Sequence, residues 1–298
     1  MSPYRQEAAR ALGFAVIVSA AMFVISVIAI LASRGALQTV ALRFASACAR
    51  LWAAVPYALQ VVLGIVVIGG ILAAGAGVYV VGKQWWATRT RMRVLSAVAV
   101  VPPPSLQPLL GRYDLVDCVD LIETSSPLAL TAGFIRPRIV LSTGLVALLD
   151  ATELEAVLLH ERSHLQHRDP AYLLLARALA AAFVFVPIVG WFVSRYLAAV
   201  ELAADDEAIA VQGDALHLLS AMVKVLRRGA ASPAGAFTAA GDLRLSRLLD
   251  GAVRLPQASH GVIVQSAVVG VFLAAPAAVV FLLAADVSRL SFLLRCMV

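Results

Sequence analysis

The pattern HERSH contains the residues best suited to do chemistry in this sequence, namely His160, Glu161 and His164. Two histidines four residues apart lie on the same face of a helix, one turn from each other. Their imidazoles can bind one zinc ion, and the intervening glutamate can take a proton from a water that the ion activates. The pattern therefore predicts a catalytic zinc site with His160 and His164 as ligands and Glu161 as the general base.

A bare HExxH pattern also occurs by chance, so its surroundings matter. Asp150 followed three residues later by Glu153 forms a capping-box pattern, which marks the start of a helix just before the motif. His167 lacks the spacing of a third zinc-binding histidine and is interpreted as a basic group near the helix C-terminus. His217 and His260 belong to no motif.

A site with two histidines needs a third protein ligand, and the acidic run ELAADDEA supplies candidates. Glu201 and Asp205 are four residues apart and share one helical face. We predict Glu201 as the third ligand, because a two-histidine, one-carboxylate set leaves a coordination position open for catalysis. Asp205 is predicted to accept a hydrogen bond from a ligating imidazole. Asp206 and Glu207 are interpreted as a solvated helix face, and the alternative is that the whole cluster is solvated.

The rest of the chain is unusually apolar. Of its 298 residues, 61% are hydrophobic and only 14% are charged, a composition that predicts a membrane protein. The 24 Lys and Arg residues outnumber the 18 Asp and Glu residues. We interpret this excess as the basic flanks of membrane spans, not as a surface for nucleic acid. The three cysteines form no CxxC pair and support neither disulfides nor a cysteine metal site.

Three apolar stretches are long enough to cross a bilayer core of about 30 Å. They cover residues 11–33, 58–82 and 261–285, the first two with approximate bounds. The first stretch exceeds the core of a signal peptide and no persuasive cleavage site accompanies it, so we expect a retained span. The sequence thus predicts an N-terminal membrane region at 1–100, and a C-terminal transmembrane helix with a short tail at 259–298.

Basic residues follow the second span at once: Lys83, Arg89, Arg91 and Arg93. Such residues are enriched on the cytoplasmic side. Residues 101–258 are therefore expected to form a cytoplasmic domain of a multi-pass protein of the bacterial cell membrane. Within it, the stiff segment 102–108 precedes three short strands predicted in 115–142. A flexible stretch is predicted at 229–241.

The segment between the motif and the acidic run constrains the topology. Residues 171–194 are nearly as apolar as a span. A single crossing would place Glu201 and His160 on opposite sides of the membrane, where they could not share a metal. The segment must therefore enter and return if Glu201 is a ligand.

Pro187 supplies a natural break for such a return, and Asp169 supplies an N-cap for its first arm. The prediction is an apolar helical hairpin at about 170–211, with its tip against or inside the bilayer. The expected fold is a mainly α membrane protein, in which transmembrane helices accompany a small α+β metalloprotease domain.

The stretch FIRPRIVLSTGLVALLDATELEAVLLHERSHLQHRDP, with the hairpin and ELAAD after it, resembles the BlaR/MecR-type family of integral-membrane zinc metallopeptidases. The likeness covers about residues 105–255, and HExxH with ExxxD is shared with the related HtpX-type membrane proteases. The resemblance implies a zincin-like, gluzincin-like endopeptidase with the ligands and base named above. It also implies that the strand RPRIVLS lies beside the cleft and can pair with an extended substrate.

Antibiotic-sensing members of that family carry a C-terminal penicillin-binding sensor domain, which we expect to be lacking because the sequence ends at Val298. The resemblance implies regulated proteolysis or signal transduction, by cleavage of a cytoplasmic regulator such as a BlaI-type repressor or of the chain itself near Phe237. The alternatives are an HtpX-like quality-control protease and a non-catalytic membrane signalling scaffold.

Zn²⁺ is the expected cofactor, although manganese or cobalt suits the same ligands. The expected partners are a protein or peptide substrate and the lipid bilayer, with no direct contact to nucleic acid. A homo-oligomer is left open.

Overall fold

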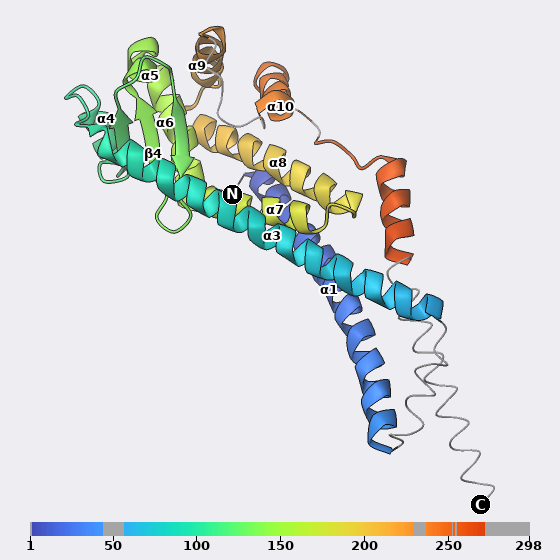
Figure 1. Ribbon diagram of the computed structural model, residues 1–298. Helices are drawn as coiled ribbons and strands as arrows, with labels where there is room; N and C mark the ends of the chain where they lie inside the picture. The colour runs from blue at the N-terminus through green and yellow to red at the C-terminus, as the bar shows by residue number, and fades with distance from the viewer. Residues whose placement is uncertain (1, 44–56, 229–236, 252, 254, 272–298) are drawn as a thin grey trace, which may run out of the picture. The chain divides into compact units, whose positions relative to one another are not determined.

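The computed structural model describes residues 2–43, 57–228, 237–251, 253 and 255–271. These residues form mostly helices, together with one small mixed sheet (Figure 1). The third predicted span extends past the described residues. Its first part forms the helix His260–Val271, and the remainder of that prediction lies outside them.

The first two predicted spans lie inside helices that are longer than the apolar stretches themselves. These helices are α1 (Pro3–Arg43) and α3 (Tyr57–Ala97). Among the described residues, two helical stretches are long and apolar enough to cross a membrane: Pro3–Val24 of α1, and α8 (Pro187–Gln212). Half of the apolar window of α8 is buried inside the protein, against 22% for α1. α8 therefore also serves as a core helix.

The described chain divides into two compact units. The first comprises residues of Met1–Gly13, Tyr79–Ala178 and Phe192–Gln257, and the second comprises residues of Phe14–Val78, Leu179–Trp191 and Ala258–Val298. The start of the chain and residues 79–100, which the sequence places in the membrane region, thus group with the HExxH motif. Within the second unit, the Ile188 amide donates a hydrogen bond to Ser266 Oγ at 2.9 Å.

A four-stranded sheet lies in the first unit. Its strands are β1 (Ala99–Val100), β2 (Val119–Ile122), β3 (Ala129–Ala132) and β4 (Arg138–Ser142), in the order β1-β2-β4-β3. β2, β3 and β4 are the three strands predicted within 115–142. β4 pairs in parallel with β2 and antiparallel with β3. Both edges of β4 are therefore filled, so the expectation that RPRIVLS pairs with a substrate is wrong.

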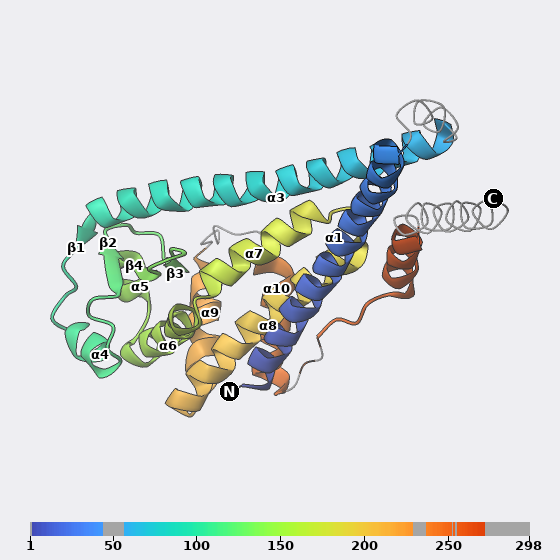
Figure 2. The ribbon, with the colours of Figure 1, turned by 90° about the horizontal axis from the view of Figure 1, so that it is seen from below.

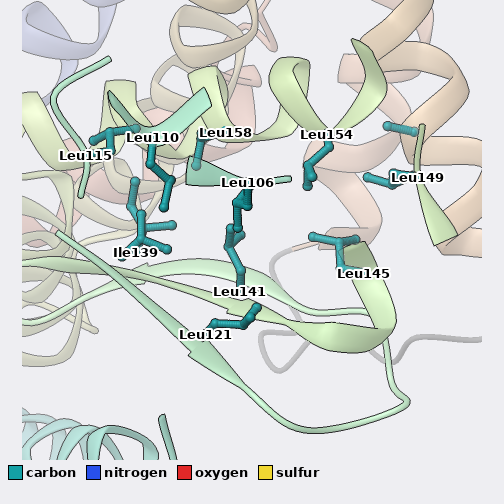
Figure 3. Packing of buried hydrophobic residues seen from close by; sticks show 12 residues of the cluster. Leu106, Leu110, Leu115, Leu121, Ile139, Leu141, Leu145, Leu149, Leu154 and Leu158 are labelled. Carbon is teal, nitrogen blue, oxygen red and sulfur yellow. The ribbon is translucent and has the colours of Figure 1, made fainter. Parts of the chain in front are cut away.

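Apolar side chains hold the sheet to α4 (Gln107–Arg112), α5 (Thr143–Leu148) and α6 (Ala151–His167). Figures 1 and 2 both show α5 and α6 beside the strands. Side chains two apart on a strand, or four apart on a helix, share one face. Their cluster is drawn in Figure 3 and includes Leu106, Leu110, Leu121, Ile139, Leu141, Leu145, Leu154 and Leu158. Each fully buried leucine stabilises the fold by roughly 1.5–3 kcal/mol, so the cluster fixes α6, and with it the motif, against the sheet.

Both ends of α6 are well defined. The Asp150 side chain accepts hydrogen bonds from the amides of Thr152 and Glu153, and the Glu153 side chain accepts one from the Asp150 amide. This is the predicted capping box. At the other end, Arg168 adopts a left-handed conformation with φ of 54°. The chain therefore turns sharply after the motif, and Asp169 begins the next helix.

Two helices cover the predicted hairpin, α7 (Asp169–Ala182) and α8, and α9 (Leu216–Arg227) follows them. α10 (Phe237–Asp250) begins inside the stretch predicted to be flexible. Residues 237–241 are helical, whereas 229–236 lie outside the described residues. The helix is anchored by Arg244 and Arg247, which form ion pairs with carboxylates of α8.

Candidate metal centre

Three of the predicted residues meet at one point of the first unit. Nε2 of His160 lies 3.1 Å from Nε2 of His164 and 3.6 Å from Oε2 of Glu201. Nε2 of His164 lies 3.8 Å from Oε1 of Glu201. Ligand atoms bound tetrahedrally at about 2.0–2.1 Å from zinc are roughly 3.3 Å apart. The spacing and the chemistry of this donor set therefore fit a zinc ion. Among the described residues, these three form the group of His, Cys, Asp and Glu side chains with such spacing.

Glu201 reaches the histidines although 171–194 separate them in sequence. α6 carries both histidines, and α8 carries Glu201 about four turns after it begins at Pro187. Because the three ligand atoms lie within 4.8 Å of one another, the intervening chain leaves the site and returns to it.

Each imidazole is oriented at its other nitrogen by a carboxylate. Nδ1 of His160 lies 2.8 Å from Oδ1 of Asp205, and Nδ1 of His164 lies 2.8 Å from Oδ2 of Asp169. A carboxylate accepts a hydrogen bond, so Nδ1 carries the proton and the Nε2 lone pair is left for a metal. The sequence pattern predicts Asp205 for this contact. It predicts Asp169 only as a helix start and misses its contact with His164.

Asp205 is completely buried, and its charge is balanced by Arg244 of α10. Nε and Nη2 of Arg244 donate to the two carboxylate oxygens at 2.8 and 2.7 Å, and Nη1 donates to Oε2 of Glu201 at 3.2 Å. One guanidinium thus holds both Glu201 and the partner of His160. Sequence reasoning missed Arg244, because its residue type marks it only as a cation on an amphipathic helix.

The charges around His160 act in opposite directions. Burial and the nearby Arg244 guanidinium disfavour a charged imidazole, but hydrogen bonds to Asp205 and Glu201 outweigh them and raise the pKa of His160 to about 9. Burial likewise disfavours the charged guanidinium, yet Asp205 and Glu201 raise the pKa of Arg244 above its usual range. The carboxylates therefore dominate the local field, which favours a bound cation.

Glu161 is buried and is held at the edge strand β3. The hydroxyl oxygen of Thr131 lies 2.7 Å from Oε2 of Glu161 and 3.0 Å from its backbone carbonyl oxygen. These two acceptors share the single hydroxyl proton. The sequence pattern does not single out Thr131, since the contact depends on β3 packing against α6.

The remaining acidic residues of α8 are not the solvated face that the sequence predicts. Oε2 of Glu207 accepts a hydrogen bond from Ser163 Oγ at 2.7 Å, and Oδ1 of Asp206 accepts one from Arg247 at 3.1 Å. The start of α1 also covers this face, because Ser2 Oγ donates to Asp206 at 3.1 Å. His167 lies outside the metal group, and its Nδ1 is 2.9 Å from the Ser163 carbonyl oxygen.

A metallopeptidase family model matches the region that contains this site, and two curated proteins match part of the chain. Residues 117–227 match the family model described as BlaR1 peptidase M56. The plastoglobule-localized metallopeptidase 48, chloroplastic, of Arabidopsis thaliana is 30% identical over 122 residues, which are 37% of this chain and 36% of that protein. Protease HtpX homolog 2 of Methanosarcina mazei is 28% identical over 165 residues, 44% of this chain and 52% of that protein. The chain spans about half, or less, of these curated relatives, and no solved structure matches it.

The matched region holds α6 with its two histidines, and the part of α8 with Glu201 and Asp205. The two relatives are named as a metallopeptidase and a protease, which supports a peptidase function and implies a metal ion. Residues 117–227 are therefore similar to the BlaR1 peptidase M56 family, and the resemblance of this chain to the BlaR/MecR-type metallopeptidases is confirmed.

Proposed function

We propose that the chain is a membrane-embedded, zinc-dependent endopeptidase. The observation that carries this proposal is the meeting of His160, His164 and Glu201 at one point, with Glu161 at the adjacent position of α6. Two imidazoles and one carboxylate form the ligand set of catalytic zinc sites with an open position. Zinc bound there would polarise a peptide carbonyl and make water nucleophilic near neutral pH.

Glu161 is the general base of this proposal. Its hydrogen bond with Thr131 restricts the carboxylate to one orientation. It takes the proton from the attacking water and transfers it to the leaving amine. Asp205 and Asp169 keep the Nδ1 protons on the two imidazoles throughout, so the histidines act as ligands and not as acids.

An extended polypeptide is the proposed substrate, bound at the edge of β3. β4 occupies one edge of β3, and no strand of the described residues occupies the other. A peptide can add to such an edge by backbone hydrogen bonds. Thr131 lies on β3 and contacts Glu161, so a peptide added there would lie close to the base. β3 thus takes the place of RPRIVLS in the predicted cleft.

The proposed location is the bacterial cell membrane, in a multi-pass arrangement with the catalytic unit on the cytoplasmic side. Support comes from the apolar helical stretch Pro3–Val24 and from the composition of the whole chain. The basic residues after the second predicted span are exposed on α3, as cytoplasmic flanking residues are expected to be: Lys83, Arg89, Arg91 and Arg93.

Regulated proteolysis is the proposed role, because the family match is to BlaR1, and a BlaI-type repressor is the proposed substrate. The similarity to an HtpX homolog favours quality control as a second candidate. Cleavage of one regulator would support the first role, and degradation of many unfolded proteins would support the second.

The complete set of ligands and base disfavours a non-catalytic scaffold. Self-cleavage near Phe237 and a homo-oligomer stay predictions.

The deciding variant is Glu161→Gln in the detergent-purified full chain. Removing the base while keeping its volume should leave about one bound zinc per chain and lower kcat for a protein substrate by about 10²–10⁴-fold. Zinc content by mass spectrometry and cleavage of an unfolded test protein measure both effects. Glu155→Gln is the matched control on the same helix, because Glu155 contacts Arg112 and Tyr113 instead of the metal centre.

Glu201→Ala tests the third ligand in the same assays. Zinc should be lost together with activity, because only two protein ligands remain. Unchanged zinc content and cleavage in Glu201→Ala would place the third ligand elsewhere. A wild-type chain that binds no metal would overturn the proposed protease and favour the scaffold.

A further inference from the structure

The first turns of α1 are docked on the unit that carries the metal centre. Ala8 and Ala11 are buried, and their small side chains allow the helix to approach closely. Four polar contacts fasten it: Ser2 to Asp206, Tyr4 to the Val253 carbonyl, Arg5 to Asp169, and Glu7 to Arg195. The start of the chain is thus a built part of this unit.

Arg5 is the buried member of this set, with only 7% of its surface exposed. Its Nη1 lies 2.8 Å from both carboxylate oxygens of Asp169, and its Nη2 donates to Ser163 Oγ at 2.7 Å. Its Nε lies 3.5 Å from Oε1 of Glu207. Burying a guanidinium costs free energy unless it is paired. Here every polar partner belongs to the segments that flank the metal centre.

Asp169 links Arg5 to the metal centre. The carboxylate oxygen that accepts from Nδ1 of His164 is Oδ2, and the same Oδ2 lies 2.8 Å from Nη1 of Arg5. We propose that Arg5 is a positioning residue of the zinc site, which fixes the Asp169 carboxylate and through it the ring orientation and tautomer of His164. This inference rests on the proposed function, because it assigns Arg5 a role toward the same metal.

The alternative is that Arg5 only anchors α1. The two roles differ in what they change. An anchor affects how firmly the helix is held, whereas a positioning residue affects the geometry and affinity of the metal site itself. Outer partners of metal-bound histidines typically change metal affinity by about 10–100-fold when they are replaced.

The test is the Zn²⁺ affinity of the full chain in detergent, measured by competition with a chromophoric chelator. Arg5→Gln should weaken Zn²⁺ binding by about 10–100-fold. The Co²⁺-substituted protein should also show altered visible absorption bands, which report the coordination geometry. Arg10→Gln is the matched control, because Arg10 lies on the same helix, has a side chain 68% exposed, and forms a long ion pair with Glu7 at 4.0 Å instead of contacting the metal centre. Glu7→Gln controls for weaker docking of α1, since it breaks the pair with Arg195.

A double variant sharpens the assignment. If Arg5 acts through Asp169, then Arg5→Gln and Asp169→Asn should each weaken Zn²⁺ binding, and together they should weaken it by less than the product of their separate effects. Additive effects on binding would instead mean that Arg5 acts independently of Asp169 and would overturn the proposal.

Arg5→Lys keeps the test decisive if Arg5→Gln does not fold. A lysine keeps the positive charge but cannot grip Asp169 and Ser163 with two separate nitrogens, so weaker Zn²⁺ binding is still expected. Wild-type affinity and cobalt spectrum in Arg5→Lys, or in a folded Arg5→Gln, would overturn the inference and leave the proposed function standing. A wild-type chain that binds no Zn²⁺ would overturn both.

Discussion

The two imidazoles of the metal centre are held by parallel chains of contacts. Asp205 contacts Nδ1 of His160 and accepts hydrogen bonds from two nitrogens of Arg244 in α10. His164 is held by Asp169, which Arg5 of α1 grips through Nη1. Each carboxylate faces a cation on one side and an imidazole on the other. The arginines therefore orient both carboxylates, and the Nε2 atoms of the two imidazoles are left to face the metal position.

Removing both members of such a buried pair should cost less stability than the sum of the costs of removing each one alone. Arg244→Met leaves the completely buried Asp205 without its guanidinium, and breaking a buried pair in this way costs about 3–5 kcal/mol. Asp205→Asn should also destabilise, because Arg244 loses the two charged hydrogen bonds that it donates to the Asp205 carboxylate. The double variant should lose less than the sum of the two, since no uncompensated charge remains. Denaturant unfolding of the chelator-treated protein in detergent measures these differences.

Arg247→Met is the control for this cycle. Arg247 lies on the same helix and pairs with Asp206 at 3.1 Å, but neither side chain is completely buried, so its loss should cost less than the loss of Arg244. Equal losses for Arg244→Met and Arg247→Met, or strict additivity in the Arg244–Asp205 cycle, would contradict the role of the buried pair.

At the scale of elements, α6 is positioned by its N-terminus as well as by its apolar face. Glu153 completes the capping box and also accepts hydrogen bonds from Ser220 and Lys224 of α9, each at 2.6 Å. Burial disfavours the charged carboxylate, but Lys224, Ser220 and the Asp150 amide outweigh this and hold the pKa of Glu153 below its usual value. One carboxylate thus joins the start of the motif helix to α9.

This arrangement predicts a stability difference that depends on pH. Glu153 has a folded-state pKa below its unfolded value, so its stabilisation is fully present at neutral pH and is lost as the pH falls through the folded pKa. Glu153→Gln should therefore unfold more easily by about 1–2 kcal/mol at pH 7. The gap should narrow once the pH drops below about 4.3, the ordinary pKa of glutamate. Denaturant unfolding of both proteins from about pH 2.5 to pH 8, a range that extends below the ordinary glutamate pKa, measures the gap. A gap that widens toward acid pH would contradict the prediction.

The elements were predictable from the sequence where local pattern determines them. Three signals of this kind are local: the capping box at Asp150, the apolar spacing of α6 and the break at Pro187. In the structure, α6 begins directly after Asp150 and α8 begins at Pro187. The strand order was not predictable in this way. β4 is central only because β2 joins it in parallel across the intervening chain, and no local pattern of apolar residues reports that pairing.

Local sequence patterns likewise identify only part of the metal centre. His160, His164 and Glu201 could be predicted because their residue types and helical spacing match the ligand set of a catalytic zinc site. Arg5 and Arg244 could not, since their roles depend on where α1 and α10 come to lie. Arg5 is 164 residues from Asp169, and Arg244 is 39 residues from Asp205. Only a search for cations able to balance each buried aspartate would have pointed to them.

For the molecule as a whole, the chain segments that make up the first unit restrict how the chain can cross a membrane. Residues of Met1–Gly13 and of Tyr79–Ala178 belong to this one unit. In the proposed membrane arrangement both segments lie on the same side, because a bilayer between them would divide a compact unit. That arrangement therefore requires the apolar stretch that begins in α1 to be followed by a return before Tyr79.

Cysteine labelling in cells tests this topology. In a background without Cys48, Cys118 and Cys296, single cysteines replace Gln6 or Val116, both of which are exposed in the first unit. With the unit in the cytoplasm, a membrane-impermeant maleimide should label neither variant in intact cells and both after permeabilisation. Labelling of both in intact cells would move the whole unit to the outer side and leave it undivided. Labelling of position 6 alone would mean that the start of α1 and the metal centre lie on opposite sides of the membrane. That result would contradict both the grouping of these segments in one unit and the role proposed for Arg5.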